Sequence, residues 1–194
     1  TQVGTGNYNE KTACQYTDLS YITADEGIGQ DANTFFKNLA IGNLNGTYRH
    51  LLVAPNAMKS KLMSLIDREI AKGGDGYIFL KLNSVTDLEL IDKLRQASQA
   101  GVEIRMIVRG ICCLLPGVPG ETEHIRITSI VGRFLEHSRI YLFGRGQEET
   151  IYISSADFMT RNMNRRVEGA CPIHSQEAKR KMMQLVVTQL QGNT

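Results

Sequence analysis

The chain has 194 residues, of which 42% are hydrophobic and 22% charged, and its formal net charge is +2. That length suffices for one substantial core, or for one domain and part of another, and the composition is ordinary for a globular protein. The small net charge gives no global electrostatic reason to expect nucleic acid as a partner. No apolar run reaches the roughly 18 residues that a transmembrane helix needs. Four cysteines without metal-ligand spacing favour reduced thiols.

The first 45 residues contain a glycine-rich turn at Gly4–Asn7, a short apolar stretch at Leu19–Thr23 and a helical segment near Asp31–Ala40. The Gly42–Gly46 stretch reads as a loop, because Gly and Asn dominate it. We therefore expect two units, residues 1–45 and residues 46–194.

The middle of the chain alternates between apolar strands and amphipathic helices. We expect strands at His50–Ala54, Tyr77–Leu82 and Val102–Val108, and helices at Met58–Ala71 and Asp87–Ala100. This order predicts parallel strands with a right-handed crossover. Functional residues in such sheets gather at the carboxyl ends of the strands, and here those ends carry Lys81, Asn83 and Arg109.

The last third of the chain predicts further strands and a final helix. We expect a strand at His124–Ile130, one beginning at His137, a hairpin at residues 144–149, strands at Ile151–Ser154 and Arg165–Cys171, and a helix at Gln176–Leu190. The predicted fold class is therefore α/β, with a mixed β-sheet flanked by helices.

His137 and Arg139 stand two positions apart at the start of an apolar strand, which puts both side chains on one face. The polar turn Ser154–Asp157 ends the next strand. An imidazole, a guanidinium and hydroxyl donors can therefore converge on one point. That combination suits a transferring phosphoryl group, because its chemistry depends mainly on positioning and charge neutralisation.

The chain also contains an internal duplication. Asn7 precedes Asp18 by 11 positions, Asp157 precedes Glu168 by the same interval, and the two copies are offset by 150. An apolar stretch and a helical segment follow each acid. We interpret this as two related half-sites that face each other.

Most of these side chains also have an ordinary structural alternative. Each arginine of the C-terminal half could lie on a solvated surface, and Ser154 and Ser155 could serve only turn formation. His50, His124 and His174 have no motif around them, so we expect structural or exposed roles for them.

Six segments carry a family resemblance, and they occur in order: Gly4–Ala13, Leu52–Asn56, Lys81–Ser84, Ile107–Leu114, Ile130–Ile140 and Ser154–Asn162. Together with the Tyr16-Thr17-Asp18 triplet, they resemble bacterial polyphosphate kinase of the large form, which is built on a phospholipase-D-like duplication. The resemblance implies a second phospholipase-D-like catalytic domain at residues 46–194, preceded by the tail end of a homologous first repeat.

The resemblance implies reversible transfer of the terminal phosphate of ATP to polyphosphate through a phosphohistidine. We expect that histidine, and the Mg²⁺ ligands, to lie upstream of Thr1 in a longer protein, with no metal site in this chain, so that the chain alone is inactive. The resemblance also implies a cytoplasmic homo-oligomer, with peripheral association at the inner membrane left open. ATP or ADP and polyphosphate are its expected partners, and nucleic acid is not.

The resemblance assigns roles to particular side chains. It implies ATP contacts for Tyr16, Arg109 and His137, and His137 also suits proton transfer. Asp18 and Glu168 are expected to orient the two active histidines. Phosphate contacts are expected for a further group: Arg139, Lys81, Asn7, Ser154 and Ser155.

Two other functions stay open at this point. One is a phospholipase-D-type phosphodiesterase, although Arg139 and Asp157 replace the lysine and asparagine of that motif. The other is a non-catalytic module that binds nucleotide or polyphosphate.

Overall fold

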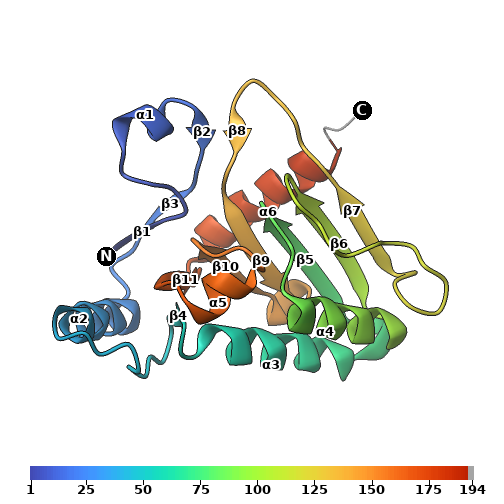
Figure 1. The fold of residues 1–194 in the computed structure, drawn as a ribbon, viewed down its shortest axis with the longest axis horizontal. Coiled ribbons are helices and arrows are strands. Elements are labelled where there is room, and N and C mark those ends of the chain that lie inside the picture. The colour runs from blue at the N-terminus through green and yellow to red at the C-terminus, as the bar shows by residue number, and fades with distance from the viewer. Residues whose placement is uncertain (192–194) are drawn as a thin grey trace.

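A computed structural model describes residues 1–191, and its centre is one seven-stranded sheet in the order β4-β11-β10-β9-β5-β6-β7 (Figure 1). The strands β5, β6 and β7 run parallel to one another, whereas the other neighbours in the sheet are antiparallel. The expected α/β class with a mixed sheet is therefore confirmed. The strands are β4 (Leu52–Ala54), β5 (Tyr77–Leu82), β6 (Glu103–Val108), β7 (Ile125–Thr128), β9 (Arg139–Phe143), β10 (Thr150–Ser154) and β11 (Glu168–Pro172).

Helices cover both faces of this sheet. Helices α3 (Met58–Ile70) and α4 (Leu88–Gln99) pack on one face, where they meet Ile78 and Leu80 of β5. Helix α6 (Gln176–Gln191) packs on the other face, to which β5 contributes Phe79. Alternate residues of β5 thus serve opposite cores, as the period-two geometry of a strand requires. Burying each such side chain contributes roughly 1.5–3 kcal/mol.

The β5-α4-β6 unit confirms the predicted crossover, with β5 and β6 parallel. Asp87 caps α4 by accepting a hydrogen bond from the Leu90 amide at 3.1 Å. The helix stops just before Gly101, whose φ of +91° is a conformation that glycine adopts readily. Asn83 and Arg109 consequently follow the carboxyl ends of neighbouring strands.

Three details differ from expectation. Helix α2 (Glu26–Ala40) begins five residues before the expected segment, because Asp25 caps it and Gly27 and Gly29 obscured the pattern. The strand expected to begin at His137 begins at Arg139 instead, and His137 lies between β8 (Leu135–Glu136) and β9. The short helices α1 (Glu10–Ala13) and α5 (Thr160–Asn164) and two 3₁₀ turns, η1 (Gly73–Asp75) and η2 (Gly146–Glu148), were not expected.

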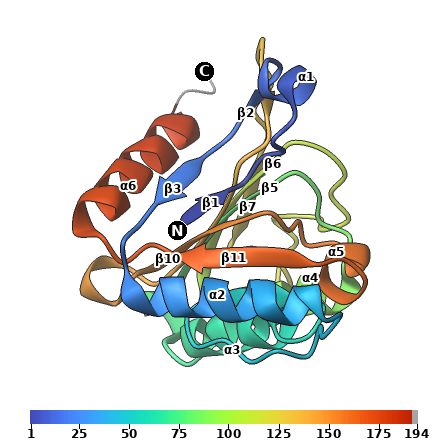
Figure 2. The same ribbon diagram turned by 90° about the vertical axis from the view of Figure 1, so that its left-hand side faces the viewer.

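The first 25 residues form a small lobe beside the sheet (Figure 2). Strand β1 (Gln2–Gly4) pairs antiparallel with β3 (Ser20–Ile22), and β2 (Tyr16–Thr17) pairs parallel with β8. The β2–β8 pair joins segments about 120 positions apart and brings the lobe against the strand that leads to β9. No helix within residues 1–191 is both long and apolar enough to cross a membrane.

Candidate functional site

His137 lies where the N-terminal lobe meets the sheet. Its backbone N–H donates to Thr17 O at 3.1 Å, and the Leu135 N–H donates to Gln15 O at 2.9 Å. This short parallel pairing sets Tyr16 beside the histidine, with their ring centroids 4.8 Å apart. The lobe therefore forms one wall of the site and the sheet forms the other.

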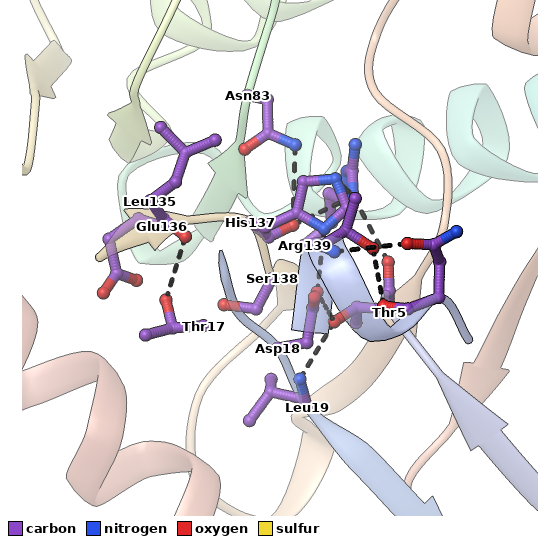
Figure 3. Close-up of polar contacts among 12 residues, drawn as sticks. Thr5, Thr17, Asp18, Leu19, Asn83, Leu135, Glu136, His137, Ser138 and Arg139 are labelled. Atoms are coloured by element: carbon purple, nitrogen blue, oxygen red, sulfur yellow. Dashed lines mark hydrogen bonds and ion pairs between the residues drawn. The ribbon is translucent and has the colours of Figure 1, made fainter. Parts of the chain in front are cut away.

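The imidazole of His137 is held at both nitrogens (Figure 3). Its Nδ1 lies 2.9 Å from Asp18 Oδ1, and its Nε2 lies 3.1 Å from Arg139 Nη1. An ionised carboxylate can only accept a hydrogen bond, and a guanidinium can only donate one. The neutral ring therefore carries its proton on Nδ1 and presents the lone pair of Nε2 to Arg139.

The surroundings also favour the neutral form of this ring. Burial lowers the pKa of His137, the positive charge of Arg139 lowers it further, and the hydrogen bond and charge of Asp18 act in the opposite direction. The side chain of His137 is 13% exposed and that of Asp18 is 25% exposed. The ring is therefore mainly uncharged near neutral pH, yet it can be reached from solvent.

Arg139 is fixed by a two-point ion pair with Asp157. Its Nη2 lies 3.0 Å from Asp157 Oδ2, its Nε donates to Oδ1 at 3.3 Å, and both side chains are 9% exposed. The same guanidinium donates to the carbonyl of His137 at 2.9 Å and to that of Thr5 at 3.3 Å. Because a guanidinium is a rigid fork, these contacts fix the orientation of the whole group.

Asp18 is oriented by its own lobe. Thr5 Oγ1 donates to Asp18 Oδ1 at 2.8 Å and accepts from the Leu19 N–H at 2.9 Å. A Cβ at Gly6 would overlap the Asp18 carboxylate, so only glycine lets the turn approach this closely. Thr5 and Gly6 thus place the carboxylate that holds the imidazole.

Arg109 reaches the site through Asn83. Its Nε donates to Asn83 Oδ1 at 3.2 Å, and Asn83 Nδ2 donates to the carbonyl of His137 at 3.5 Å. The positive charge of Arg109 also lowers the pKa of His137 slightly. The expected convergence at the carboxyl ends of β5 and β6 therefore includes Asn83 and Arg109.

Lys81 has a different environment from the one expected of a phosphate ligand. Its ammonium is buried and lies 2.6 Å from Glu136 Oε2 and 2.5 Å from Ser138 Oγ. The Glu136 carboxylate pairs with this charge, and burial keeps the ammonium away from solvent. These contacts favour a structural role for Lys81 over binding of phosphate.

The serines and Glu168 hold one another in the turn after β10. Ser154 Oγ donates to Gly169 O at 3.1 Å, and Ser155 Oγ donates to the Glu168 carboxylate. Glu168 also accepts from Asn162 Nδ2 at 2.6 Å, so its recorded partners do not include His137. Asn7 is exposed on the loop between β1 and α1.

Three side chains of the site were missing from the sequence-based set or were assigned no role there: Thr5, Asn83 and Asp157. The duplication offered a signal for Thr5, because it occupies the position equivalent to Ser155. Asp157 was expected only as part of the turn that follows the strand, as the repeat equivalent of Asn7 and as a departure from a known motif. Its pairing with Arg139 requires knowing that both side chains point into the same interface.

Residues 1–191 contain no cluster of three or more His, Cys, Asp and Glu side chains that could hold a metal ion.

The fold and the site define a class of protein: a mixed α/β domain in which a histidine and an arginine two residues apart meet a carboxylate from a neighbouring lobe. Residues 51–194 match the family described as polyphosphate kinase C-terminal domain 2, and residues 1–44 match polyphosphate kinase C-terminal domain 1. The chain belongs to the polyphosphate kinase family.

Individual relatives agree with this assignment. A polyphosphate kinase from Halalkalibacterium halodurans is 48% identical over 98% of this chain, which spans 28% of that relative's length. The crystal structure of polyphosphate kinase from Porphyromonas gingivalis is 41% identical, with a TM-score of 0.90 over 97% of this chain and 30% of that one. NucT from Helicobacter pylori, at 13% identity and a TM-score of 0.53, covers 72% of this chain and 93% of its own and shares the fold alone.

Proposed function

We propose that the chain supplies one wall of the active site of a phosphotransferase, which moves the terminal phosphate of ATP reversibly to inorganic polyphosphate. Membership of the polyphosphate kinase family supports the reaction. The observation that carries the proposal is the imidazole of His137, held between Asp18 at 2.9 Å and Arg139 at 3.1 Å.

Each contact of His137 has a use in phosphoryl transfer. Asp18 fixes the tautomer and stabilises the ring when it is protonated. Arg139 and Arg109 supply positive charge to phosphate oxygens. Tyr16, 4.8 Å from the imidazole between centroids, is placed to contact the nucleotide by stacking or through its hydroxyl.

The protonation of His137 would be coupled to the arrival of phosphate. In the neutral ring, Nε2 accepts from Arg139 Nη1. When Nε2 takes up a proton it becomes a donor and no longer accepts from Nη1, so the ring N–H can donate to an incoming phosphoryl oxygen. The negative charge of that oxygen offsets the repulsion between the two cations. His137 would therefore take up and return a proton while the transferring group is bound.

The remaining parts of the site belong to residues outside this chain. The phosphohistidine and the Mg²⁺ ligands would be among them. Glu168, which occupies the repeat position of Asp18, would orient the second active histidine. We further propose a homo-oligomeric, cytoplasmic parent protein with peripheral membrane association, which acts on ATP or ADP and polyphosphate and not on nucleic acid.

A phosphodiesterase is less well supported by the same site. Arg139 and Asp157 form a two-point pair in place of the lysine and asparagine expected there, and a lysine ammonium cannot reproduce that fork geometry. For the chain alone, a binding module without transferase activity remains the better description.

Labelled ATP tests the proposal. With Mg²⁺ and [γ-³²P]ATP, the longer protein should gain acid-labile label and form polyphosphate, whereas residues 1–194 alone should do neither. In the longer protein, His137→Ala should lower kcat by about 10²- to 10⁴-fold, the usual contribution of a positioned acid–base group, while the circular dichroism spectrum stays unchanged. Acid-labile label on the isolated chain, or near-normal turnover by His137→Ala, would contradict the proposal. Hydrolysis of bis-p-nitrophenyl phosphate would favour the phosphodiesterase.

A further inference from the structure

The two neighbours of His137 in the sequence point away from its ring and toward one buried lysine. In Figure 3 the side chains of Glu136 and Ser138 extend to the left of the chain, and the imidazole extends to the right. Lys81 Nζ lies 2.6 Å from Glu136 Oε2 and 2.5 Å from Ser138 Oγ. A single ammonium therefore binds the residue before the histidine and the residue after it.

This ammonium lies in the middle of the sheet, where a lysine is unusual. Lys81 is 2% exposed on β5, and lysines are almost never that buried unless they are paired. Burial lowers the pKa of Lys81, and Glu136 opposes that shift by hydrogen bonding and charge. Gln189 of α6 donates to the same Glu136 oxygen at 3.2 Å. The carboxylate is thus held from β5 and from α6.

The contacts fall where the backbone ladder is interrupted. Strand β8 ends at Glu136 and β9 begins at Arg139, so His137 and Ser138 lie outside both strands. The last β5–β9 pair is Lys81 with Ile140. Beyond that pair, the Lys81 side chain contacts Glu136 and Ser138, in the segment between β8 and β9 where the backbone hydrogen bonds of the sheet stop.

We infer that Lys81 is a positioning residue for His137: by binding Glu136 and Ser138 it fixes the short segment between β8 and β9 and sets the imidazole between Asp18 and Arg139. Residues i−1 and i+1 of an extended chain share one face, so holding both leaves residue i a single direction. The inference rests on the proposed role of His137. It gives Lys81 a different task from direct phosphate binding.

The test compares two lysines that both form partly or fully buried ion pairs. Lys81→Met removes the ammonium and keeps the apolar stem. Lys59→Met is the matched control, because Lys59 pairs with Asp87 and Glu89 at 3.0 and 3.1 Å, is 15% exposed in its side chain and contacts none of the residues around His137. The kinetic constants are measured in the longer protein. The ¹⁵N signals and pH titration of the His137 ring are measured in this chain.

Lys81→Met should lower kcat by about 10²-fold, the loss that a displacement near 1 Å of a catalytic group can cause, and leave the KM for ATP nearly unchanged. It should also shift the His137 ring signals away from the pure Nδ1–H tautomer. Ser138→Ala should move both readouts in the same direction by less. Lys59→Met should change neither readout.

Unchanged kcat and unchanged ring signals in Lys81→Met would overturn the inference, even if that variant melts at a lower temperature. Should Lys81→Met not fold, Ser138→Ala decides the matter in the same way. If the unmodified longer protein transfers no phosphate, the proposed function fails. The ring signals of the isolated chain then still show whether Lys81 positions His137.

Discussion

The turn after β1 and the turn after β10 have the same backbone design but hold different partners. In the first copy Val3 pairs with Tyr21, and in the second Ile153 pairs with Cys171, a register offset of 150 on both strands. The Thr5 N–H donates to Leu19 O at 3.0 Å, and the Ser155 N–H donates to Gly169 O at 3.0 Å. The same pairing of strands therefore occurs both outside and inside the large sheet.

The difference lies in what each turn receives from a distance. Asp18 accepts from His137, which belongs to the other half of the chain, whereas the equivalent Glu168 accepts from Asn162 and Ser155 within its own copy. Asn7 is exposed, whereas the equivalent Asp157 is buried against Arg139. A shared frame thus acquires a chemical role only when long-range pairing brings a second side chain to it.

Among the changes that test this comparison, loss of the buried ion pair between Arg139 and Asp157 should have the largest effect. Arg139→Met leaves Asp157 with only backbone N–H donors, and loss of one partner of a buried pair costs about 3–5 kcal/mol. The free energy of unfolding of this chain, from urea denaturation, should fall by that amount. The control Arg145→Met removes an exposed pair with Glu103 and should cost less than about 1 kcal/mol. Equal losses in the two variants would mean that the buried Arg139–Asp157 pair stabilises the chain no more than an exposed pair does.

Neutralising each of the two acids, Asp18 and Glu168, tests the comparison between the two turns further. In the longer protein, Asp18→Asn should lower kcat by about 10²-fold, because the ring loses its orientation. In this chain, the same substitution should lower the pKa of His137, because Asp18 opposes the effects of burial and Arg139. Glu168→Gln should leave the His137 titration in this chain unaltered. Ring titrations by NMR check both statements. A response of His137 to Glu168→Gln as large as that to Asp18→Asn would contradict the assignment.

The stability of the chain should also depend on pH through His137. Its pKa in the folded state lies below the value near 6.5 of an unfolded chain, so the unfolded chain binds more protons in that interval. The contribution of His137 is therefore fully present above about pH 6.5, and it is lost as pH falls through the folded value. The difference in unfolding free energy between the unmodified chain and His137→Gln should shrink from about pH 8 to about pH 5. A difference that grows toward acid pH would reverse the sign.

Sequence periodicity was a good guide where elements are long. The β5-α4-β6 unit gave the right strand direction, and with it the place of Asn83 and Arg109. The β2–β8 pair could not be predicted, because strands of two residues carry no period. That pair is what joins Asp18 to His137. Without it, the duplication indicated only that two acids are equivalent.

The direction of buried side chains was the second feature that the sequence could not predict. A lysine at the end of an apolar strand can point into a crevice or into the sheet, and alternation alone does not choose between them when both faces are buried. Lys81 points toward the face of the sheet that α6 covers, where its ammonium contacts Glu136. Ser154 and Ser155 are similar, because hydroxyls in a turn can bind either a ligand or the backbone beside them.

The two hydroxyls that support the acids provide the finest test of the comparison. Thr5→Val leaves the Leu19 N–H without its side-chain acceptor and removes one of the donors to Asp18, and Ser155→Ala does the same to the Gly169 N–H and Glu168. Each change should lower the free energy of unfolding by about 1 kcal/mol, the typical net value of such a hydrogen bond. Only Thr5→Val should alter the ring signals of His137, since Asp18, and not Glu168, is the acid that contacts that ring. Urea denaturation and ¹⁵N spectra of the two variants separate stability from positioning. A shift of the ring signals in Ser155→Ala equal to that in Thr5→Val would mean that the two copies are coupled by a route other than Asp18.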